Sequence, residues 1–238
     1  MSAPLLQVTG LGKRFGGFVA LSGIDLAIAP GERLGLVGPN GSGKSTFVNC
    51  LGGAFARYEG KIEFAGMGLA GLPPYRRAKL GLARTFQLPR AFASLTVAEN
   101  VQIPLRFLGA DGPLAARARE GLERVGLAAK ANARPKQLSQ AELRRLELAR
   151  ALACRPRLLI ADEAMAGLSH AEVDDILALL FATNAEGGVA IVMIEHVMRA
   201  VTAFAERLVV FVAGRKIADG ATASVLRLKE VETAYLGE

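Results

Sequence analysis

The chain has 238 residues, of which 51% are hydrophobic, and a formal net charge of +7. A chain of this length can bury roughly three quarters of the surface that its unfolded form exposes, so its fold needs no disulfide or metal support. No apolar run approaches the ~18 residues that span a bilayer, and no secretion signal opens the sequence, so we expect a cytosolic protein.

The positive charge has two interpretations. It favours anionic partners such as nucleotide phosphates, nucleic acid or lipid headgroups, or it only aids solubility. No block of five or more like charges exists, so we expect no nucleic-acid-binding tail. The cysteines, Cys50 and Cys154, follow no metal or redox spacing and are expected to be small apolar fillers in helices.

The first part of the chain alternates short apolar segments with helix-forming ones, which predicts an α/β sheet. Strands are expected at Leu5–Val8, Ile24–Ile28, Arg33–Val37 and Lys61–Phe64. The strand at Arg33–Val37 runs into a glycine-rich turn, after which Lys44–Leu51 begins a helix.

The middle of the chain has a different character. From about Leu88 to Leu152 strand signals vanish and helix formers dominate, most clearly over Leu114–Arg124. Later strands are expected at Leu158–Ala161, Val189–Ile194 and Leu208–Val212, followed by a turn and strand at Ala213–Ala218 and a helical tail. We therefore predict one α/β domain, with a core of residues 1–87 and 153–221, a helical insert of residues 88–152 and a tail of residues 222–238.

A phosphate-binding pattern, G-x-x-x-x-G-K-[ST], follows the third expected strand. Its residues are Gly38, Pro39, Asn40, Gly41, Ser42, Gly43, Lys44, Ser45 and Thr46. Glycines let successive backbone N–H groups turn inward around an anion, and the following helix directs its positive end at the same phosphates. Lys44 can reach the β- and γ-phosphates, and the Ser45 hydroxyl can reach Mg²⁺.

Two carboxylates, Asp162 and Glu163, follow the apolar strand at Leu158–Ala161. Ligands of open α/β sheets bind at the carboxyl ends of the strands. We therefore expect Asp162 to hold Mg²⁺, directly or through water, and Glu163 to polarise an attacking water.

The segment Leu138–Leu152, which begins Leu-Ser-Gln-Ala-Glu, resembles the signature segment (residues 138–142) and following helix of ABC ATPases. A P-loop kinase or GTPase has no reason to carry it. The resemblance extends over nearly the whole chain. It implies a P-loop (RecA-like) α/β core with an antiparallel β subdomain and an inserted helical subdomain, and Mg-ATP hydrolysis coupled to transport.

The resemblance also assigns roles to further residues. Phe15 matches the aromatic that stacks on adenine, Gln87 the glutamine that links the Mg²⁺ site to the helical insert, and His196 the histidine that contacts the γ-phosphate. Ser139 is the part of the signature segment that would contact nucleotide, and residues 166–169 occupy the D-loop position. Lys44, Gln87, Glu163 and His196 would thus carry catalysis, and Ser45, Gln87 and Asp162 the metal.

Within the family, several phrases are similar to the ATPase subunits of branched-chain amino acid importers, a group that includes urea and related amide importers. They are residues 13–17 (KRFGG), 83–87 (ARTFQ), 95–101 (LTVAENV) and 234–237 (AYLG). The group implies a sandwich of two ATPase chains, identical or different, in which each ATP lies between one P-loop and the other chain's signature segment. It also implies permease subunits contacted through the helical insert, a peripheral position on the inner face of the membrane, and no nucleic acid.

The signature segment departs from the family's L-S-G-G-Q. Gln140 and Ala141 replace the glycines and Glu142 replaces glutamine. A positive φ at Ala141 would cost roughly 1–2 kcal/mol, and the charge of Glu142 would oppose a nearby phosphate. Ala164 and Ser169 also differ from the family's usual Pro and Asp or Asn. We therefore expect two unequal ATP sites, unless the family tolerates such drift.

Three other interpretations stay open from the sequence. The first is a regulatory or non-transport cassette that binds ATP without cleaving it, which the signature drift favours and the intact Glu163 and His196 oppose. The second is a soluble ABC ATPase acting on DNA or ribosomes, which usually has two cassettes, coiled-coil arms or zinc modules. The third, a P-loop kinase, leaves residues 138–152 unexplained.

Overall fold

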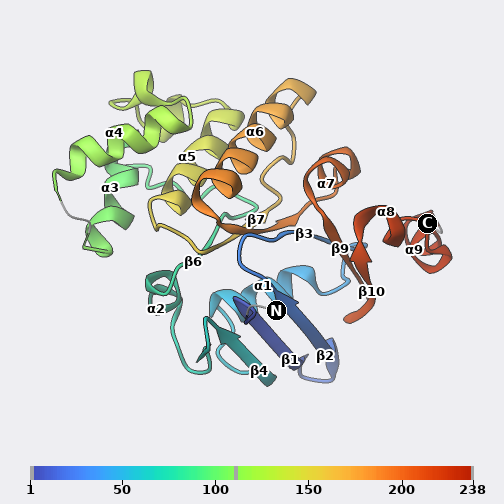
Figure 1. The fold of residues 1–238 in the computed structure, drawn as a ribbon. Helices are drawn as coiled ribbons and strands as arrows, with labels where there is room; N and C mark the ends of the chain where they lie inside the picture. The colour runs from blue at the N-terminus through green and yellow to red at the C-terminus, as the bar shows by residue number, and fades with distance from the viewer. Residues whose placement is uncertain (1–2, 110–111, 237–238) are drawn as a thin grey trace.

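The structure, a computed structural model, describes residues 3–109 and 112–236. A six-stranded sheet forms its centre, with the strand order β10-β9-β3-β8-β7-β6 (Figure 1). Five strands run parallel, and β10 pairs antiparallel with β9 at one edge. In that order the strands span Arg215–Ala221, Arg207–Val212, Arg33–Val37, Ala190–Ile194, Leu158–Asp162 and Leu82–Arg84.

A second, four-stranded antiparallel sheet has the order β2-β1-β4-β5. In that order its strands span Phe18–Ile28, Leu6–Phe15, Glu59–Phe64 and Met67–Gly68. The two sheets lie on opposite sides of helix α1, Lys44–Gly52 (Figure 1). This confirms the predicted fold class, an α/β core with an antiparallel β subdomain.

Helices α3, α4 and α5 pack together beside the sheet edge at β6 and β7 (Figure 1). Those three helices span Val97–Phe107, Leu114–Arg124 and Gln140–Leu152, and short 3-10 turns at Ala128–Lys130 and Pro135–Gln137 connect α4 to α5. The remaining helices are α2 at Pro74–Lys79, α6 at His170–Gly187, α7 at Met198–Phe204, α8 at Thr222–Val225 and α9 at Lys229–Leu236. Within the described ranges, no helix is both long and apolar enough to cross a membrane.

Two hydrophobic clusters follow from the period-2 alternation of the buried strands. Leu158 and Ile160 of β7 face α1 and the antiparallel sheet, whereas Leu159 and Ala161 face α6 and α7. A third cluster joins α3, α4 and α5 through residues such as Val101, Leu122 and Leu146. The helical segment thus has a core of its own, while its exact limits as an insert stay a prediction.

A buried arginine fixes the far end of α1. Arg77 of α2 is 1% exposed and donates to the carbonyls of Cys50 and Leu51, at 2.6 and 2.8 Å, and of Leu69 and Leu72, at 2.8 and 2.9 Å. The last carbonyls of a helix carry partial negative charge and favour a cation. The helix that follows the phosphate loop is therefore anchored at its C-terminus, which holds its N-terminus in place at the site.

Candidate nucleotide-binding site

Three neighbouring strands bring the predicted site residues together at the carboxyl ends of the parallel strands. Ile194 of β8 pairs in register with Leu36 of β3 on one side and with Asp162 of β7 on the other. The loop of residues 38–46 follows β3, Glu163 directly follows β7, and His196 is the second residue after β8. The three segments therefore leave the sheet at the same level and meet above it.

The loop of residues 38–46 has the open backbone that a phosphate cradle requires. Gly38, Gly41 and Gly43 have φ values of 152°, 77° and 102°, a region that favours glycine. A Cβ at Gly38 would lie 2.1 Å from the carbonyl oxygen of Phe211, and one at Gly43 would lie 2.8 Å from that of Ala20. Glycine is thus needed at these two positions both for conformation and for close packing.

The N-terminus of α1 is capped differently from those of three other helices. Its N-cap, Gly43, offers no side-chain hydrogen bond, and no acidic residue lies in its first turn. Helices α3, α5 and α6 all differ, because each has a capping box with Glu at the third position. The first N–H groups of α1 thus have no side-chain acceptor and can bind an anion.

The side chain of Lys44 bonds to the backbone of its own loop. Its Nζ donates to the carbonyl oxygens of Gly38 and Pro39, at 2.6 and 3.1 Å, and the residue is 7% exposed. Burial lowers the pKa of Lys44, and the nearby carboxylates of Glu163 and Asp162 oppose that change. The ammonium therefore bonds to the loop carbonyls within the electrostatic reach of the acidic pair.

Asp162 is held at the end of β7 by groups on β6 and the segment that follows it. Its backbone N–H donates to Thr85 Oγ1 at 3.0 Å, and its Oδ2 lies 3.2 Å from Arg84 Nη2. Burial raises the pKa of Asp162, and the Arg84 charge opposes this. Arg84 also donates to Asn49 Oδ1 of α1 at 2.8 Å, so it ties the carboxylate to the helix behind the phosphate loop.

Glu163 has a strained backbone, and two other predicted residues hold its side chain. Its φ of 48° lies in the left-handed region, which costs a non-glycine residue roughly 1–2 kcal/mol. Gln87 Nε2 donates to its Oε2 at 2.7 Å, and His196 Nε2 lies 3.2 Å from its Oε1. Three elements thus converge on one carboxylate, and the backbone turn at Glu163 directs it away from the strand.

The predicted metal ligands all offer oxygen donors. Asp162 offers a carboxylate, Ser45 an exposed hydroxyl at the start of α1, and Gln87 an amide carbonyl. These hard oxygen donors fit Mg²⁺, which commonly takes one or two protein ligands and completes its shell with phosphates and water. Among the described residues no group of three or more His, Cys, Asp or Glu could hold a metal ion.

Two predicted residues lie outside this hydrogen-bonded group. Phe15 ends β1, is 44% exposed and packs edge-on against Phe55, with Lys13 Nζ 4.9 Å from the Phe15 ring centroid. Ser139 caps α5: its Oγ accepts the N–H of Glu142, its own N–H donates to Glu142 Oε2, and its carbonyl accepts the N–H of Leu143. The Phe15 ring is therefore partly exposed, with Lys13 over it, and no hydrogen bond among the described residues joins the Ser139 side chain to the Lys44 loop.

Ala141 of the signature segment does not adopt the positive φ that we considered from the sequence. We expected a backbone cost if Ala141 adopted a positive φ, but α5 begins at Gln140 and Ala141 lies in its first turn, outside the positive-φ residues. Glu142 completes a capping box with Ser139 and pairs with Lys130, Nζ to Oε1 at 2.6 Å. The substituted segment is thus a well-capped helix N-terminus.

Sequence reasoning missed Glu195 and Arg84. Glu195 is 2% exposed, its Oε1 accepts from the backbone N–H of Met165 at 2.8 Å, and burial raises its pKa to about 7. An acidic residue directly after an apolar parallel strand, beside His196, was the available signal. Arg84 gave no such signal, because an arginine that ends a three-residue strand looks like any surface residue.

A glycine-rich loop between a central parallel strand and a helix, with two carboxylates ending the adjacent strand, defines a P-loop nucleotide-binding protein. Residues 21–166 match the ABC transporter family. The chain belongs to that family.

Three relatives illustrate the likeness. The chain is 35% identical over 254 residues, with full coverage of both sequences, to the high-affinity branched-chain amino acid transport ATP-binding protein BraF of Pseudomonas aeruginosa (strain PAO1). It resembles the ADP conformation of MJ1267, an ATP-binding cassette of an ABC transporter, with a TM-score of 0.87, 28% identity and full coverage of both chains. It also resembles the dimeric post-hydrolysis cassette MJ0796 bound to ADP and Pi, with a TM-score of 0.83, 28% identity and coverage of 91% of this chain and 98% of that one.

The raised pKa of Glu195 predicts a pH-dependent stability. Between pH 4.5 and about 7 the folded chain holds a proton that the unfolded chain releases, so the free energy of unfolding falls as pH rises through this window. Replacing Glu195 by Gln keeps an acceptor for Met165 and removes the proton. The variant should match the wild type near pH 5 and exceed it by on the order of 2–3 kcal/mol at pH 8, measured by urea unfolding.

The control is Glu186→Gln, at an exposed glutamate that pairs with Arg124. Its difference from the wild type should be the same at both pH values. A Glu195→Gln difference that stays flat between pH 5 and pH 8 would mean that Glu195 is not buried as a proton-binding group.

Proposed function

We propose that this chain is the ATP-hydrolysing subunit of an ABC importer for branched-chain amino acids or related small amides. The observation that carries the proposal is the convergence of Gln87, Glu163 and His196 beside the Lys44 loop at one sheet edge. The solute class follows from similarity to BraF, which matches this chain over its full length.

The substrate nucleotide lies along the loop of residues 38–46, and its base stacks on the exposed ring of Phe15. The free N–H groups at the start of α1 bind the terminal phosphates. Lys44 exchanges the carbonyls of Gly38 and Pro39 for the β- and γ-phosphate oxygens, because both the charge and the reach of its ammonium suit them.

Hydrolysis is an in-line attack of water on the γ-phosphate, directed by Glu163. The Glu163 carboxylate orients the water, Gln87 and His196 keep its two oxygens in position, and His196 also contacts the γ-phosphate. Mg²⁺, held by Ser45, Asp162 and Gln87, would supply neutralisation of phosphate charge. Arg84 and Thr85 keep Asp162 in its place for this purpose.

The proposed partner at the nucleotide is a second cassette, identical or different, arranged as in the dimeric MJ0796 cassette. The start of α5 at Ser139 would then face the nucleotide held by the partner's phosphate loop. Two features of this chain weaken that contact. The N–H of Glu142 already donates to Ser139 Oγ at 3.2 Å and is not free for a phosphate, and the hydrogen bond from Lys130 keeps the pKa of Glu142 below its usual value, so the carboxylate stays charged.

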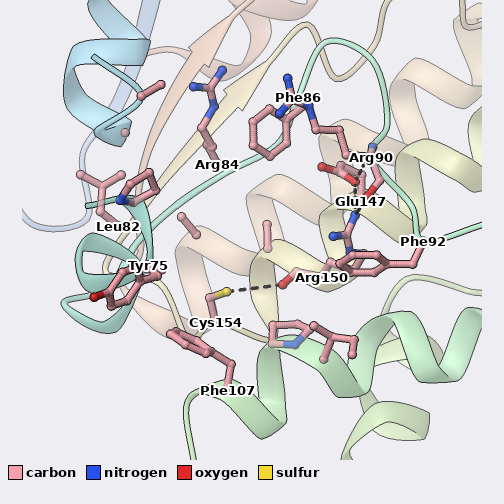
Figure 2. A pocket seen from close by; sticks show the side chains of 18 residues that line it. Tyr75, Leu82, Arg84, Phe86, Arg90, Phe92, Phe107, Glu147, Arg150 and Cys154 are labelled. Atoms are coloured by element: carbon pink, nitrogen blue, oxygen red, sulfur yellow. Dashed lines mark hydrogen bonds and ion pairs between the residues drawn. The ribbon is translucent and has the colours of Figure 1, made fainter. Parts of the chain in front are cut away.

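We further propose that the permease docks in a groove of about 460 Å³ between the sheet edge and the helical segment (Figure 2). Its lining is largely apolar and aromatic, including Tyr75, Phe92 and Phe107, and three arginines, Arg84, Arg90 and Arg150, lie along one part of it. This chemistry suits a short permease segment that offers apolar side chains and a carboxylate. The chain would thus work as a peripheral subunit at the cytoplasmic face of the membrane.

The alternative is a cassette that binds ATP mainly as a regulatory or non-transport unit. The capped signature segment is the observation that favours it. Co-purification from membranes with permease subunits, followed by an ATPase assay of the assembly with and without branched-chain amino acid, decides between the two. Solute-dependent turnover supports the importer, and an assembly that binds ATP without turnover supports the alternative.

Replacing Glu163 by Gln should abolish turnover and leave ATP binding intact. The amide keeps the shape of the side chain but loses the charge that orients water, so kcat should fall by about 100-fold or more while the nucleotide-bound dimer accumulates. Steady-state hydrolysis and size-exclusion chromatography with ATP measure both effects. The matched control is Glu123→Gln on exposed α4, which should behave as the wild type. Persistent turnover in Glu163→Gln would remove Glu163 from the mechanism.

Replacing Glu142 by Gln should raise turnover of the assembled transporter several-fold, because the amide can keep the capping box and no longer repels the partner's phosphate. Glu99→Gln makes the same change in the capping box of α3 and should leave turnover unaltered. Equal rates in the two variants would show that the charge at 142 does not limit the second site.

A further inference from the structure

Helix α5 presents three charged side chains, every third residue, to the segment of residues 86–90. They are Arg144, Glu147 and Arg150, and all three bond to that segment. Residues three apart lie on the same face of a helix, so these contacts form one continuous strip along α5. Glu147 and Arg150 also line the groove, whereas Arg144 has no role in the function proposed above.

The innermost contact is made by Arg144, which is 6% exposed. Its Nη1 donates to the carbonyl oxygen of Gln87 at 2.6 Å and to that of Phe86 at 3.2 Å. A buried guanidinium that bonds to carbonyls costs desolvation, which good geometry must offset. The side chain is thus committed to holding this turn of the backbone.

The outer contacts keep the same segment in register further along. Arg150 Nη1 donates to the carbonyl of Arg90 at 2.6 Å and to Glu147 Oε2 at 2.8 Å, and the same Glu147 oxygen accepts the backbone N–H of Arg90 at 3.3 Å (Figure 2). Glu147 is 4% exposed, and Arg150 pairs with it directly. The segment is therefore fastened to α5 at both ends, at residue 87 and at residue 90.

Gln87, whose backbone carbonyl bonds to Arg144, is also the residue whose side chain bonds to Glu163. Its Nε2 lies 2.7 Å from Glu163 Oε2. Its backbone carbonyl accepts the shorter of the two hydrogen bonds that Arg144 donates to this segment. The start of the same helix, capped by Ser139, lies little more than one turn before Arg144. A single chain of contacts thus runs from the N-terminus of α5 through Arg144 and Gln87 to the carboxylate.

We propose that Arg144 is a positioning residue for hydrolysis: it holds the Gln87 backbone so that the Gln87 side chain stays on Glu163, and it thereby links α5 to this chain's own catalytic carboxylate. The proposal rests on the proposed function, since it assigns Arg144 a role in that same reaction. It implies that Arg144 acts on kcat through Gln87 and has no direct part in nucleotide binding.

The test is a double-mutant cycle on the assembled transporter with Arg144→Met and Gln87→Ala. Arg144→Met should lower kcat by about 10- to 100-fold with KM for ATP within about twofold of the wild type. Gln87→Ala keeps the carbonyl that Arg144 holds and removes only the side chain. The double variant should therefore turn over no more slowly than Gln87→Ala alone, because interacting positions are non-additive.

Two further variants serve as controls. Arg145→Met removes the neighbouring arginine of α5, which pairs with Asp175 of α6, and should keep kcat within about twofold. Arg144→Lys retains a cationic donor and should recover at least part of the lost rate, which a purely structural role in packing the planar guanidinium would not predict. Fully additive losses in the cycle, or a wild-type kcat in Arg144→Met, overturn the proposal.

Hydrogen exchange of the isolated chain separates a failure of this inference from a failure of the proposed function. Arg144→Met should speed amide exchange in peptides covering residues 86–92 by about tenfold or more, and leave peptides of α1 unchanged. If the wild-type assembly does not hydrolyse ATP, the proposed function fails, and exchange still decides whether Arg144 holds this segment. Unchanged exchange at residues 86–92 overturns the proposal even if the transporter is active.

Discussion

The in-register pairing of β3, β8 and β7 is the constraint from which the site follows. Leu36 and Asp162 both align with Ile194, so the residues that follow the three strands leave the sheet side by side. A slip of one residue in either pairing would turn the side chains of a strand to the opposite face and break both hydrophobic clusters. The energy that holds Lys44, Glu163 and His196 together is therefore mainly that of the apolar strands beneath them.

Charge is arranged differently at the two helix N-termini that would face nucleotide. The start of α1 has neither a capping side chain nor an acidic residue in its first turn, and the ammonium of Lys44 bonds to loop carbonyls. The start of α5 has both Ser139 and Glu142, joined in a capping box. One terminus is thus open to an anion, whereas the other already has its own acceptor, and this is the structural basis for expecting two unequal ATP sites.

Much of this arrangement could be predicted from the sequence, because it depends on local signals. The loop of residues 38–46, the strand Arg33–Val37 and the acidic end of β7 stand in the order that the motif requires, and the structure has the strand with the predicted limits. The first two strands were predicted too short: β1 and β2 extend to Phe15 and from Phe18, because an antiparallel sheet with a solvated face tolerates glycine and polar residues there.

Other features depend on contacts between distant segments and left no local pattern. The strand β6 has three residues, too few for a periodic signal, yet it places Arg84 against Asp162. Glu195 and Arg144 look like ordinary polar residues until packing buries them. The concern over Ala141 was of another kind, because Ser139 and Glu142 stand at the spacing of a capping box, a local signal that places Ala141 inside the helix with no need for a positive φ.

A crystal structure of this chain with Mg²⁺ and a non-hydrolysable ATP analogue tests the central claim most directly. The account predicts that Lys44 Nζ leaves the carbonyl of Gly38 and bonds to the terminal phosphates, with Glu163 facing the γ-phosphate across a water molecule. A nucleotide bound elsewhere, or a γ-phosphate remote from Glu163 while Lys44 keeps its bond to Gly38, would contradict it.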